Sequence, residues 1–536
     1  VLLTLKFLKL YWKIVFALTW LLILIILLMN YNTSETRCAF VVLLLAGYWI
    51  TECFPMAVTS IIPVVLFPAF GILTSQEACG CYMNDTIMVF IGGLILAIAI
   101  EHSGLHLRIA LGVMKVVGCT HAKILGSLCV VTTLISMWIT NTATTAMMVP
   151  IIFAILNQLE QVLIIFILIF FFFFHSSAGL CEVYIEKITP ETAEPTYFNK
   201  YYYDYDFLIL TYCRIQEPTN ITKAYLLAAA YCSSIGGTGT LVGTGTNLTF
   251  KGIFESTFPL AEPITFTNWM IASIPQMIVN SFLTWIYLRI AFMGYLRPES
   301  KDAVAATIGA EGEAITLQVI DQRYKELGKM SFHELSVAIL FVICVILWLF
   351  RKPGFVVGWA EYLTQMNFID RDVRDSLPVI GISVLMFYIP KDLNFLQSYS
   401  RDRKYKKTQA RPLKSSEGLI TWKLIESKMP WGLMFLLGGG FAISRATVAS
   451  GMAKMVGEAM KPLRYLPPAL VLLFVSFLIG LFTEFTANVG VANITLPIVA
   501  QMCIAMDIHP LYLMVPTAIM CSYSFRLPVG TPPNAI

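Results

Sequence analysis

Long runs of apolar residues recur along the whole chain and are separated by short polar stretches. Many of the runs approach the roughly 20 residues that a helix needs to cross a bilayer, and they are continuous rather than alternating, which disfavours a membrane β-barrel. The pattern therefore predicts a bundle of membrane helices. We expect apolar helices at 14–29, 38–50, 86–100, 125–139, 146–156, 224–250, 269–295, 335–350, 377–388, 430–443, 466–482, 486–506 and 511–527, with a proline-broken stretch ending near 73.

The composition supports a bilayer environment. Of the 536 residues, 57% are hydrophobic and 13% charged, and the mean hydropathy is +0.74. Soluble domains carry roughly 25% charged residues, so an ordinary soluble enzyme is excluded. The net charge of +4 is too small to indicate a nucleic-acid partner. The twelve cysteines lack the spacing of a zinc site or of a disulfide framework, and we expect no cofactor.

Two halves of the chain repeat the same residues at a fixed offset. Asn141 coincides with Asn488 at an offset of 347 (488 − 141 = 347). The same offset superposes Pro150 on Pro497, Gly92-Gly93 on Gly439-Gly440, Ser103-Gly104 on Ser450-Gly451 and Ser136 on Thr483. A further match, of Val242-Gly243-Thr244 and Asn247 with Val529-Gly530-Thr531 and Asn534, has an offset of 287 (534 − 247 = 287). Transporters often place their sites where two repeats meet.

The two offsets differ by 60 residues (347 − 287 = 60), which the unusual segment 157–222 supplies. This segment holds a short apolar run that ends in a string of phenylalanines, and we interpret it as a variable insertion or loop and assign it no function. The segment 391–428 is rich in Lys and Arg and is interpreted as a cytoplasmic loop. The expected division is 1–156 and 223–295 for the first repeat, 296–334 for a loop, 335–390 for the start of the second repeat and 429–536 for its transport part.

Each half has a polar patch inside an apolar run. In the first half the patch is Thr140, Asn141, Thr142, Thr144 and Thr145, and in the second half it includes Thr483, Thr486 and Asn488. Breaks in a membrane helix survive mainly where they line a cavity, because their backbone groups need partners. Helix starts favour anions, while hydroxyl and carbonyl oxygens suit sodium. Hydrogen bonds between helices are the alternative interpretation, but the duplication favours a site for an anion and sodium.

The glycine-rich run 236–245 lacks the Lys-Ser/Thr ending of a P-loop, and we interpret it as a non-helical re-entrant loop at the site. Ionisable side chains inside a membrane are costly, and a functional role is their default interpretation. Five such residues lie within or beside apolar runs: Glu52, Glu101, Glu484, Arg445 and Arg526. We expect Glu101 and Glu484 at helix ends, and Arg526 either attracts an anion or pairs with a carboxylate.

These motifs resemble the divalent-anion:sodium symporter family, especially its INDY-like members. The similarity is carried by residues 137–150, 234–238, 483–489 and 527–534, except that the second Ser-Asn motif of the family reads Ala487-Asn488 here. The resemblance implies an all-α polytopic membrane protein with an inverted-repeat, elevator-type fold, about eleven membrane helices and two re-entrant hairpins. It also implies a homodimer in the plasma membrane that is a transporter and no enzyme.

The resemblance further implies the residues of the site. Substrate would contact Thr140, Asn141, Thr142, Thr238, Asn488, Val489 and Pro532. One sodium would bind at Ser136, Asn141 and Gly237, and another at Thr483, Thr486, Asn488 and Gly530. The expected function is sodium-coupled symport of di- or tricarboxylates such as succinate or citrate. A sodium-coupled sulfate symporter and a sodium-independent carboxylate exchanger or anion channel are the alternatives.

Overall fold

The computed structural model describes residues 2–117, 120–153, 156, 219–305, 310–366, 373–393, 416–528 and 530–536. Within these ranges the protein is helical, and the one β-type pairing is an isolated bridge between Pro390 and Gly418. The all-helical class predicted from the sequence is therefore confirmed. The described residues leave out most of the insertion 157–222, most of the basic segment 391–428, and Val529.

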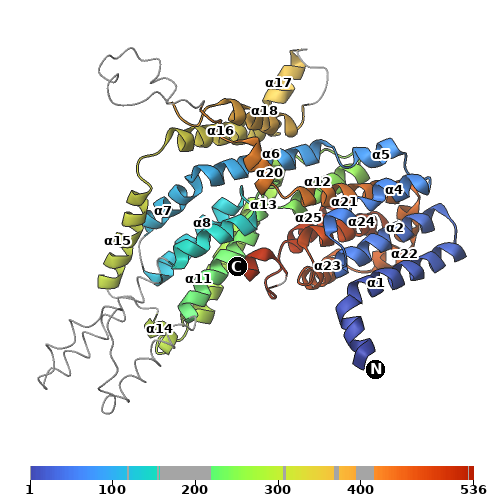
Figure 1. Cartoon of the computed structure of the whole chain (residues 1–536), viewed down its shortest axis with the longest axis horizontal. Helices are drawn as coiled ribbons and strands as arrows, with labels where there is room; N and C mark the ends of the chain where they lie inside the picture. Colours follow the sequence, from blue (N-terminus) through green and yellow to red (C-terminus); the bar gives the residue numbers. More distant parts are fainter. Residues whose placement is uncertain are drawn as a thin grey trace, which may run out of the picture.

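The first five helices form one side of the molecule together with helices from the end of the chain (Figure 1). They are α1 (Leu2–Asn30), α2 (Ser34–Thr51), α3 (Met56–Thr59), α4 (Ile62–Ala69) and α5 (Ser75–Gly80). The prolines keep α3 and α4 short, because Pro55 precedes α3 and Pro63 and Pro68 lie in α4. Side-chain caps by Thr33 and Thr74 fix the starts of α2 and α5.

The helices that follow repeat at the two offsets found in the sequence. The first set is α6 (Asp85–Ser103), α7 (Leu105–Val117), α8 (His121–Ser136), the helix Asn141–Phe153, α11 (Asn220–Gly237) and α12 (Gly245–Thr257). The second set is α21 (Trp431–Ala449), α22 (Met452–Met460) with the 3₁₀ turn Lys461–Tyr465, α23 (Pro468–Phe482), α24 (Asn488–Met506), α25 (Pro510–Cys521) and α26 (Pro532–Ala535). Helix starts at 121 and 468 and at 141 and 488 are 347 apart, and those at 245 and 532 are 287 apart.

Local turns repeat as well as helix bounds. The Ser-Gly pair 103–104 lies between α6 and α7, and the pair 450–451 lies between α21 and α22. Both glycines have a left-handed backbone conformation, with φ of 78° and 81°. In each turn the serine hydroxyl accepts a hydrogen bond from the backbone N–H two residues on, at 3.4 Å and 3.3 Å. Only glycine adopts this φ without strain, so the repeated glycines preserve the direction in which the chain leaves each long helix.

The remaining helices connect and flank the two sets. They are α13 (Phe266–Phe292), α14 (Lys301–Ala305), α15 (Ala310–Glu326), α16 (Phe332–Leu349), α17 (Trp359–Gln365), α18 (Ser376–Tyr388) and α20 (Trp422–Lys428). Segment 296–334, predicted as a loop, thus contains two helices. Their sequences are too polar to be recognised as apolar runs. The longer of the two, α15, packs along α7 (Figure 1).

Three predicted spans are shorter or shifted in the structure. The stretch 511–527 is helical only to Cys521, because its last residues form a break. The first polar patch interrupts the helix only at 137–140, and Asn141 to Thr145 form the first turn of the next helix. In the second half α24 begins at Asn488 rather than at 486. Hydropathy alone cannot locate these bounds, because polar residues that start a helix resemble a loop.

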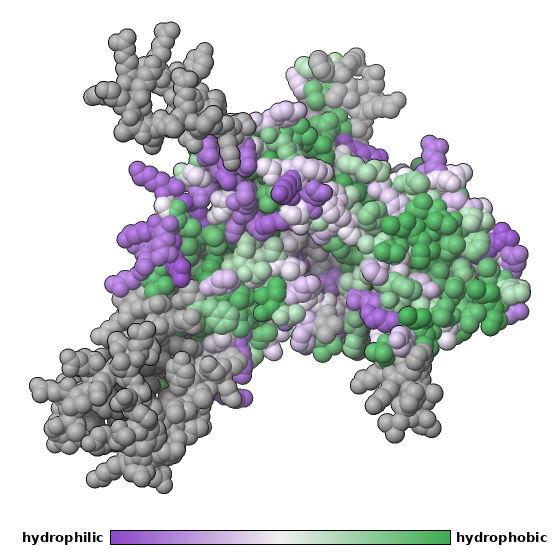
Figure 2. Space-filling model, in the orientation of Figure 1, coloured by the Kyte–Doolittle hydropathy of each residue, from purple (hydrophilic) through white to green (hydrophobic). Residues whose placement is uncertain are grey.

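Six helical segments among the described residues are long and apolar enough to cross a membrane: Leu10–Asn30, Ser75–Ser103 (α5 together with α6), Phe266–Phe292, Phe332–Leu349, Trp431–Ala449 and Asn488–Met506. Large apolar side chains also cover the surface, as the green areas of Figure 2 show on the side of α2 and α4. On α23, for example, Leu473 is 72% exposed and Phe477 59%. Such a surface suits lipid rather than water, so the protein is a multi-pass membrane protein.

A buried ion-pair network holds α12 against the segment before α18. Lys251 Nζ lies 2.9 Å from Asp375 Oδ2, and Arg351 Nε lies 2.6 Å from Asp375 Oδ1. The ammonium of Lys251 also donates to the Ile264 carbonyl at 2.8 Å. Buried charges are tolerated only when they are paired and hydrogen-bonded in this way. The network therefore fixes α12, whose first residues belong to the site described next.

Candidate functional site

In the first half three oxygens gather between α8, the helix Asn141–Phe153 and α11. The Ser136 hydroxyl oxygen lies 3.0 Å from Asn141 Oδ1 and 2.6 Å from the Ser233 carbonyl oxygen. Ser136 and Ser233 are fully buried, whereas Asn141 is half-buried at the start of its helix. The structure thus brings together two of the three residues predicted for the first sodium site.

In the second half the equivalent residues make the same arrangement. The Thr483 hydroxyl oxygen lies 3.0 Å from Asn488 Oδ1 and 2.6 Å from the Cys521 carbonyl oxygen. The Ser524 hydroxyl is 3.5 Å from the same Asn488 oxygen. Thr483 and Asn488 were both predicted by the repeat, and the structure adds Cys521 and Ser524.

The chemistry of these clusters favours a cation. Each central hydroxyl carries one proton, so it can donate to only one of its two neighbouring oxygens at a time. The other oxygen keeps a lone pair directed toward the cluster. Hydroxyl, amide and backbone carbonyl oxygens at helix breaks are the groups that bind sodium in membrane transporters. Each cluster therefore has the donor set of a sodium site.

Gly237, the third residue predicted for the first sodium site, lies beside this cluster, because its backbone approaches Asn141 closely. A Cβ atom at Gly237 would lie 2.4 Å from Asn141 Oδ1, which no side chain could avoid without moving the asparagine. At the offset of 287 the equivalent of Gly237 is Ser524 (524 − 237 = 287). In the first half Asn141 Oδ1 thus occupies the place that a side chain of residue 237 would fill, whereas the second half has a side chain there.

A second asparagine in each half holds the helix break in shape. Asn247 Nδ2 donates to the carbonyls of Gly237 and Thr240 at 3.0 Å and 2.7 Å. Asn534 Nδ2 donates to the carbonyls of Ser524 and Leu527 at 2.7 Å and 3.1 Å, which are the equivalent residues at the offset of 287. The sequence repeat contained this pair, but only the structure shows that both amides satisfy the unwound backbone.

The two halves meet at the starts of α12 and α24. The Val489 side chain packs on Gly245, where a Cβ atom would lie 2.8 Å from Val489 Cγ2. Nearby, the Thr246 and Ser522 hydroxyls are 2.6 Å apart. Neither α12 nor α24 has a side-chain cap, so their first backbone N–H groups remain available to a ligand. Two helix starts in contact provide partial positive charge for an anion.

The helix start at Asn141 differs, because Thr140 caps it. The Thr140 hydroxyl accepts from the Ala143 backbone N–H at 3.4 Å, which leaves its own proton free for a ligand oxygen. The equivalent residue in the second half is Ala487, which has no side-chain oxygen (487 − 140 = 347). Both residues are half-buried.

The remaining predicted site residues lie in varied surroundings. The Thr486 hydroxyl donates to the Trp49 carbonyl on α2 at 3.2 Å rather than joining the Thr483 cluster. The Thr238 hydroxyl donates to the Ile235 carbonyl of its own helix at 2.7 Å. Thr142 and Pro532 are exposed, and Gly530 is buried beside Ser524.

The sequence of the first polar patch allows two interpretations, either a ligand site or a source of hydrogen bonds between helices. Thr144 and Thr145 show that it is not used in one way only. Thr145 donates to the Ser233 hydroxyl at 2.9 Å, which is a bond between helices. Thr144 is fully buried, and its hydroxyl has no partner among the described residues. Part of the patch therefore packs helices together, while Asn141 and Thr140 face the site.

Most of the ionisable residues singled out in the sequence have partners outside the two clusters. Lys428 pairs with Glu101 at 2.5 Å and Arg445 with Glu77 at 3.1 Å. The carboxylate of Glu484 accepts from backbone N–H groups at 525–527. The Arg526 side chain is exposed and makes no hydrogen bond or ion pair with another described residue. Of these acidic and basic groups, Glu484 alone adjoins a cluster residue in sequence.

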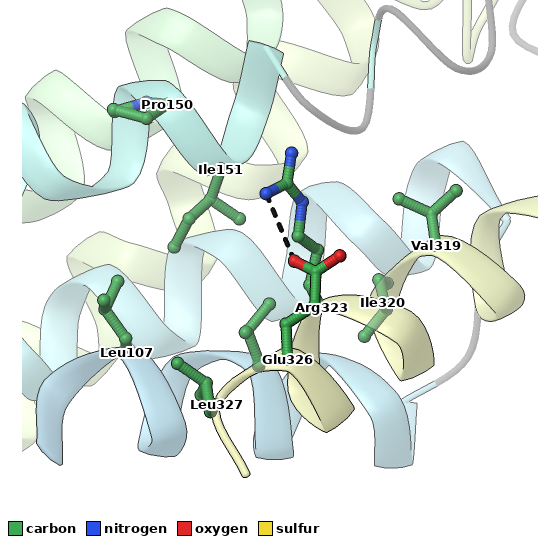
Figure 3. A pocket seen from close by; sticks show the side chains of 9 residues that line it. Leu107, Pro150, Ile151, Val319, Ile320, Arg323, Glu326 and Leu327 are labelled. Carbon is green, nitrogen blue, oxygen red and sulfur yellow. Dashed lines mark hydrogen bonds and ion pairs between the residues drawn. The ribbon is translucent and has the colours of Figure 1, made fainter. Parts of the chain in front are cut away.

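A cavity of about 290 Å³ lies away from the clusters, between α7, the helix Asn141–Phe153 and α15 (Figure 3). Its lining is mainly apolar, with Pro150 and Ile151 on one side and the ion pair of Arg323 with Glu326 on the other. It contains none of the predicted site residues. The repeated clusters, rather than this cavity, are therefore the candidate functional site.

Apolar helices that face lipid, together with paired polar breaks buried among them, define a membrane transport protein. Among the described residues no group of three His, Cys, Asp or Glu side chains is placed to hold a metal ion.

Comparison with known proteins gives the family. The model of the sodium:sulfate symporter transmembrane region matches residues 6–536, and the chain belongs to this family. It is 41% identical to Protein I'm not dead yet of Drosophila melanogaster over 98% of this chain and 83% of the relative. It is 35% identical to the Na(+)/citrate cotransporter of Mus musculus (93% and 84%) and 36% identical to the Na(+)/dicarboxylate cotransporter 3 of Homo sapiens (94% and 82%). The resemblance predicted from the motifs is confirmed.

Proposed function

We propose that this protein is a symporter that couples sodium entry to the transport of di- or tricarboxylates such as succinate or citrate. The observation that carries the proposal is the repeated cluster, in which a hydroxyl lies 3.0 Å from an asparagine oxygen and 2.6 Å from a backbone carbonyl in both halves. The names of the citrate and dicarboxylate relatives support the substrate class.

The anion would bind between the two clusters. Its carboxylates would accept from the uncapped starts of α12 and α24, from the Thr140 hydroxyl and from the amides of Asn141 and Asn488. Sodium beside each asparagine would add positive charge, so that a divalent anion binds without a buried Arg or Lys. Coupling follows, because each asparagine side chain would contact both sodium and substrate.

The architecture supports an elevator-type movement. The helices His121–Ser136 and Pro468–Phe482 are too short to cross the hydrocarbon core of about 30 Å, as expected in re-entrant hairpins. We propose that these hairpins move with α11, α12 and α25 as one body, that the two repeats are inverted, and that the protein is a homodimer in the plasma membrane. We expect no cofactor, and sodium is transported together with the substrate as the coupling ion.

Sulfate is the second candidate substrate, because the matching family model carries the name of a sodium:sulfate symporter. Sulfate also bears two negative charges and would accept from the same helix starts.

The test is uptake of labelled succinate, citrate and sulfate into cells that express the chain, in external sodium or in choline. We expect succinate or citrate uptake that disappears in choline. Uptake that is equal in the two media would contradict coupling and favour a sodium-independent exchanger or channel, while transport of sulfate alone would reassign the substrate.

A further inference from the structure

The two helix breaks differ in length. At the offset of 287 the last residue of α11, Gly237, corresponds to Ser524, yet α25 already ends at Cys521, three residues earlier (524 − 521 = 3). In the first half the N–H groups of Thr238 and Gly239 still bond to carbonyls of the preceding turn, at 3.1 Å and 2.9 Å. Among the described residues, the equivalent N–H groups of Phe525 and Arg526 make no bond to a carbonyl of the preceding turn, so they need other partners.

Glu484 supplies those partners. Its Oε1 accepts from the N–H groups of Phe525 and Arg526 at 3.0 Å and 3.1 Å, and its Oε2 accepts from those of Arg526 and Leu527 at 3.0 Å and 2.9 Å. The side chain is buried, with 3% exposed. Both oxygens act only as acceptors, which is the bonding pattern of a carboxylate.

The first half has no such group at the same place. The equivalent of Glu484 is Met137, whose thioether cannot accept several hydrogen bonds (484 − 137 = 347). The first half instead uses Thr240, whose hydroxyl donates to the Met137 carbonyl at 2.5 Å. The equivalent of Thr240 is Leu527, which has no hydroxyl. A neutral contact in one half is thus replaced by an anionic contact in the other.

We propose that Glu484 is a positioning residue that raises the sodium affinity of the second cluster above that of the first. It keeps the longer break open and thereby presents the Cys521 carbonyl and Ser524 to the cluster. Glu484 follows Thr483 directly in the sequence, and its carboxylate accepts from the N–H of Phe525, the residue after Ser524. The negative charge of this carboxylate offsets the positive ends of the N–H dipoles, which would otherwise repel a cation. This inference rests on the proposed sodium symport.

The test measures the external sodium concentration for half-maximal uptake of labelled succinate in cells that express the whole chain. We expect E484Q to raise this concentration about tenfold, because one acceptor oxygen and the charge are lost. E484D keeps the charge on a shorter side chain and should raise it about threefold. The matched control is M137L, the equivalent position of the first half, which should leave the value unchanged. Surface biotinylation corrects for the amount of protein.

A merely structural role would lower the maximal rate and the surface amount without moving the sodium dependence. Wild-type sodium dependence in E484Q overturns the inference, and if E484Q fails to reach the surface, the same result in E484D overturns it. Absence of any sodium dependence in the wild type would contradict the proposed function instead.

Hydrogen exchange of the purified protein gives a readout independent of transport. The peptide that contains the N–H groups of 525–527 should exchange faster in E484Q or E484D, while the peptide with 238–240 should not change. Equal protection of 525–527 in variant and wild type would overturn the role of Glu484 in the break.

Discussion

The two helix breaks share a geometry but use different side chains. In both, a hydroxyl lies 3.0 Å from an asparagine oxygen and 2.6 Å from a carbonyl, although the hydroxyl belongs to Ser136 in one half and to Thr483 in the other. Around this common centre Gly237 is replaced by Ser524. The oxygen cluster is therefore the constant element, while the residues around it differ between the two halves.

The surroundings differ most in how much space they leave. The first cluster is closed tightly, because Asn141 lies against the bare backbone of Gly237. The second is looser, because α25 ends early and Ser524 fits at the equivalent position. Exchanging residues between the halves is therefore a direct way to test whether the two sites are tuned differently.

The largest effect is expected from Gly237→Ser, which gives the first half the residue of the second. The new Cβ would lie 2.4 Å from Asn141 Oδ1, so the asparagine must leave the cluster. Losing this oxygen as a partner of the bound cation costs about 3 kcal/mol, which corresponds to roughly a hundredfold loss in sodium affinity. The sodium dependence of uptake measures it.

The reciprocal change, Ser524→Gly, is the control. It removes one oxygen at 3.5 Å and creates no clash, so sodium affinity should fall by only about threefold. Equal effects of the two substitutions would show that the halves are not tuned differently.

A smaller effect is expected when the asparagines that hold the breaks are removed. Asn247→Ala leaves the carbonyls of Gly237 and Thr240 unpaired in a fully buried place, which should lower the free energy of unfolding by about 2 kcal/mol. Asn534→Ala should cost less, because Asn534 is only half-buried and water can replace its amide. Thermal unfolding of the purified protein shows which variant is less stable. A larger loss of stability in Asn534→Ala than in Asn247→Ala would argue against this prediction.

The smallest effect is expected at the helix starts. Ala487→Ser gives α24 a hydroxyl at the position of Thr140, and its proton can be donated to the substrate. A hydrogen bond of this kind is worth about 1 kcal/mol, so the succinate concentration for half-maximal uptake should fall severalfold. Thr140→Ala is the mirror variant and should raise that concentration. No change in Ala487→Ser would show that this position does not contact substrate.

Much of the fold and the centre of the site could be predicted from the sequence. Apolar runs revealed the membrane helices, and the offsets of 347 and 287 paired Ser136 with Thr483 and Asn141 with Asn488. The offset works because a backbone that leaves the helix at the same place in both halves needs a hydroxyl and an amide there. The offset of 287 could also have indicated Ser524 as a site residue, because it is the equivalent of Gly237.

Other features could not be predicted, for identifiable physical reasons. The Ser233 and Cys521 carbonyls belong to the backbone, so no side-chain pattern marks them. Thr486 lies in the second polar patch, yet its hydroxyl turns to Trp49, a partner 437 residues away. The helices of 296–334 have charged surfaces and no long apolar run, so hydropathy does not reveal them.

We propose that each half binds one sodium at its hydroxyl, amide and carbonyl oxygens. Equilibrium binding of ²²Na⁺ to the purified protein, with saturating succinate, tests it most directly in wild type, Ser136→Ala, Thr483→Val and the double variant. Each single substitution should remove one bound sodium per chain, and the double variant should remove two. An unchanged number of bound sodium ions in either single variant would show that the cluster of that half does not bind sodium.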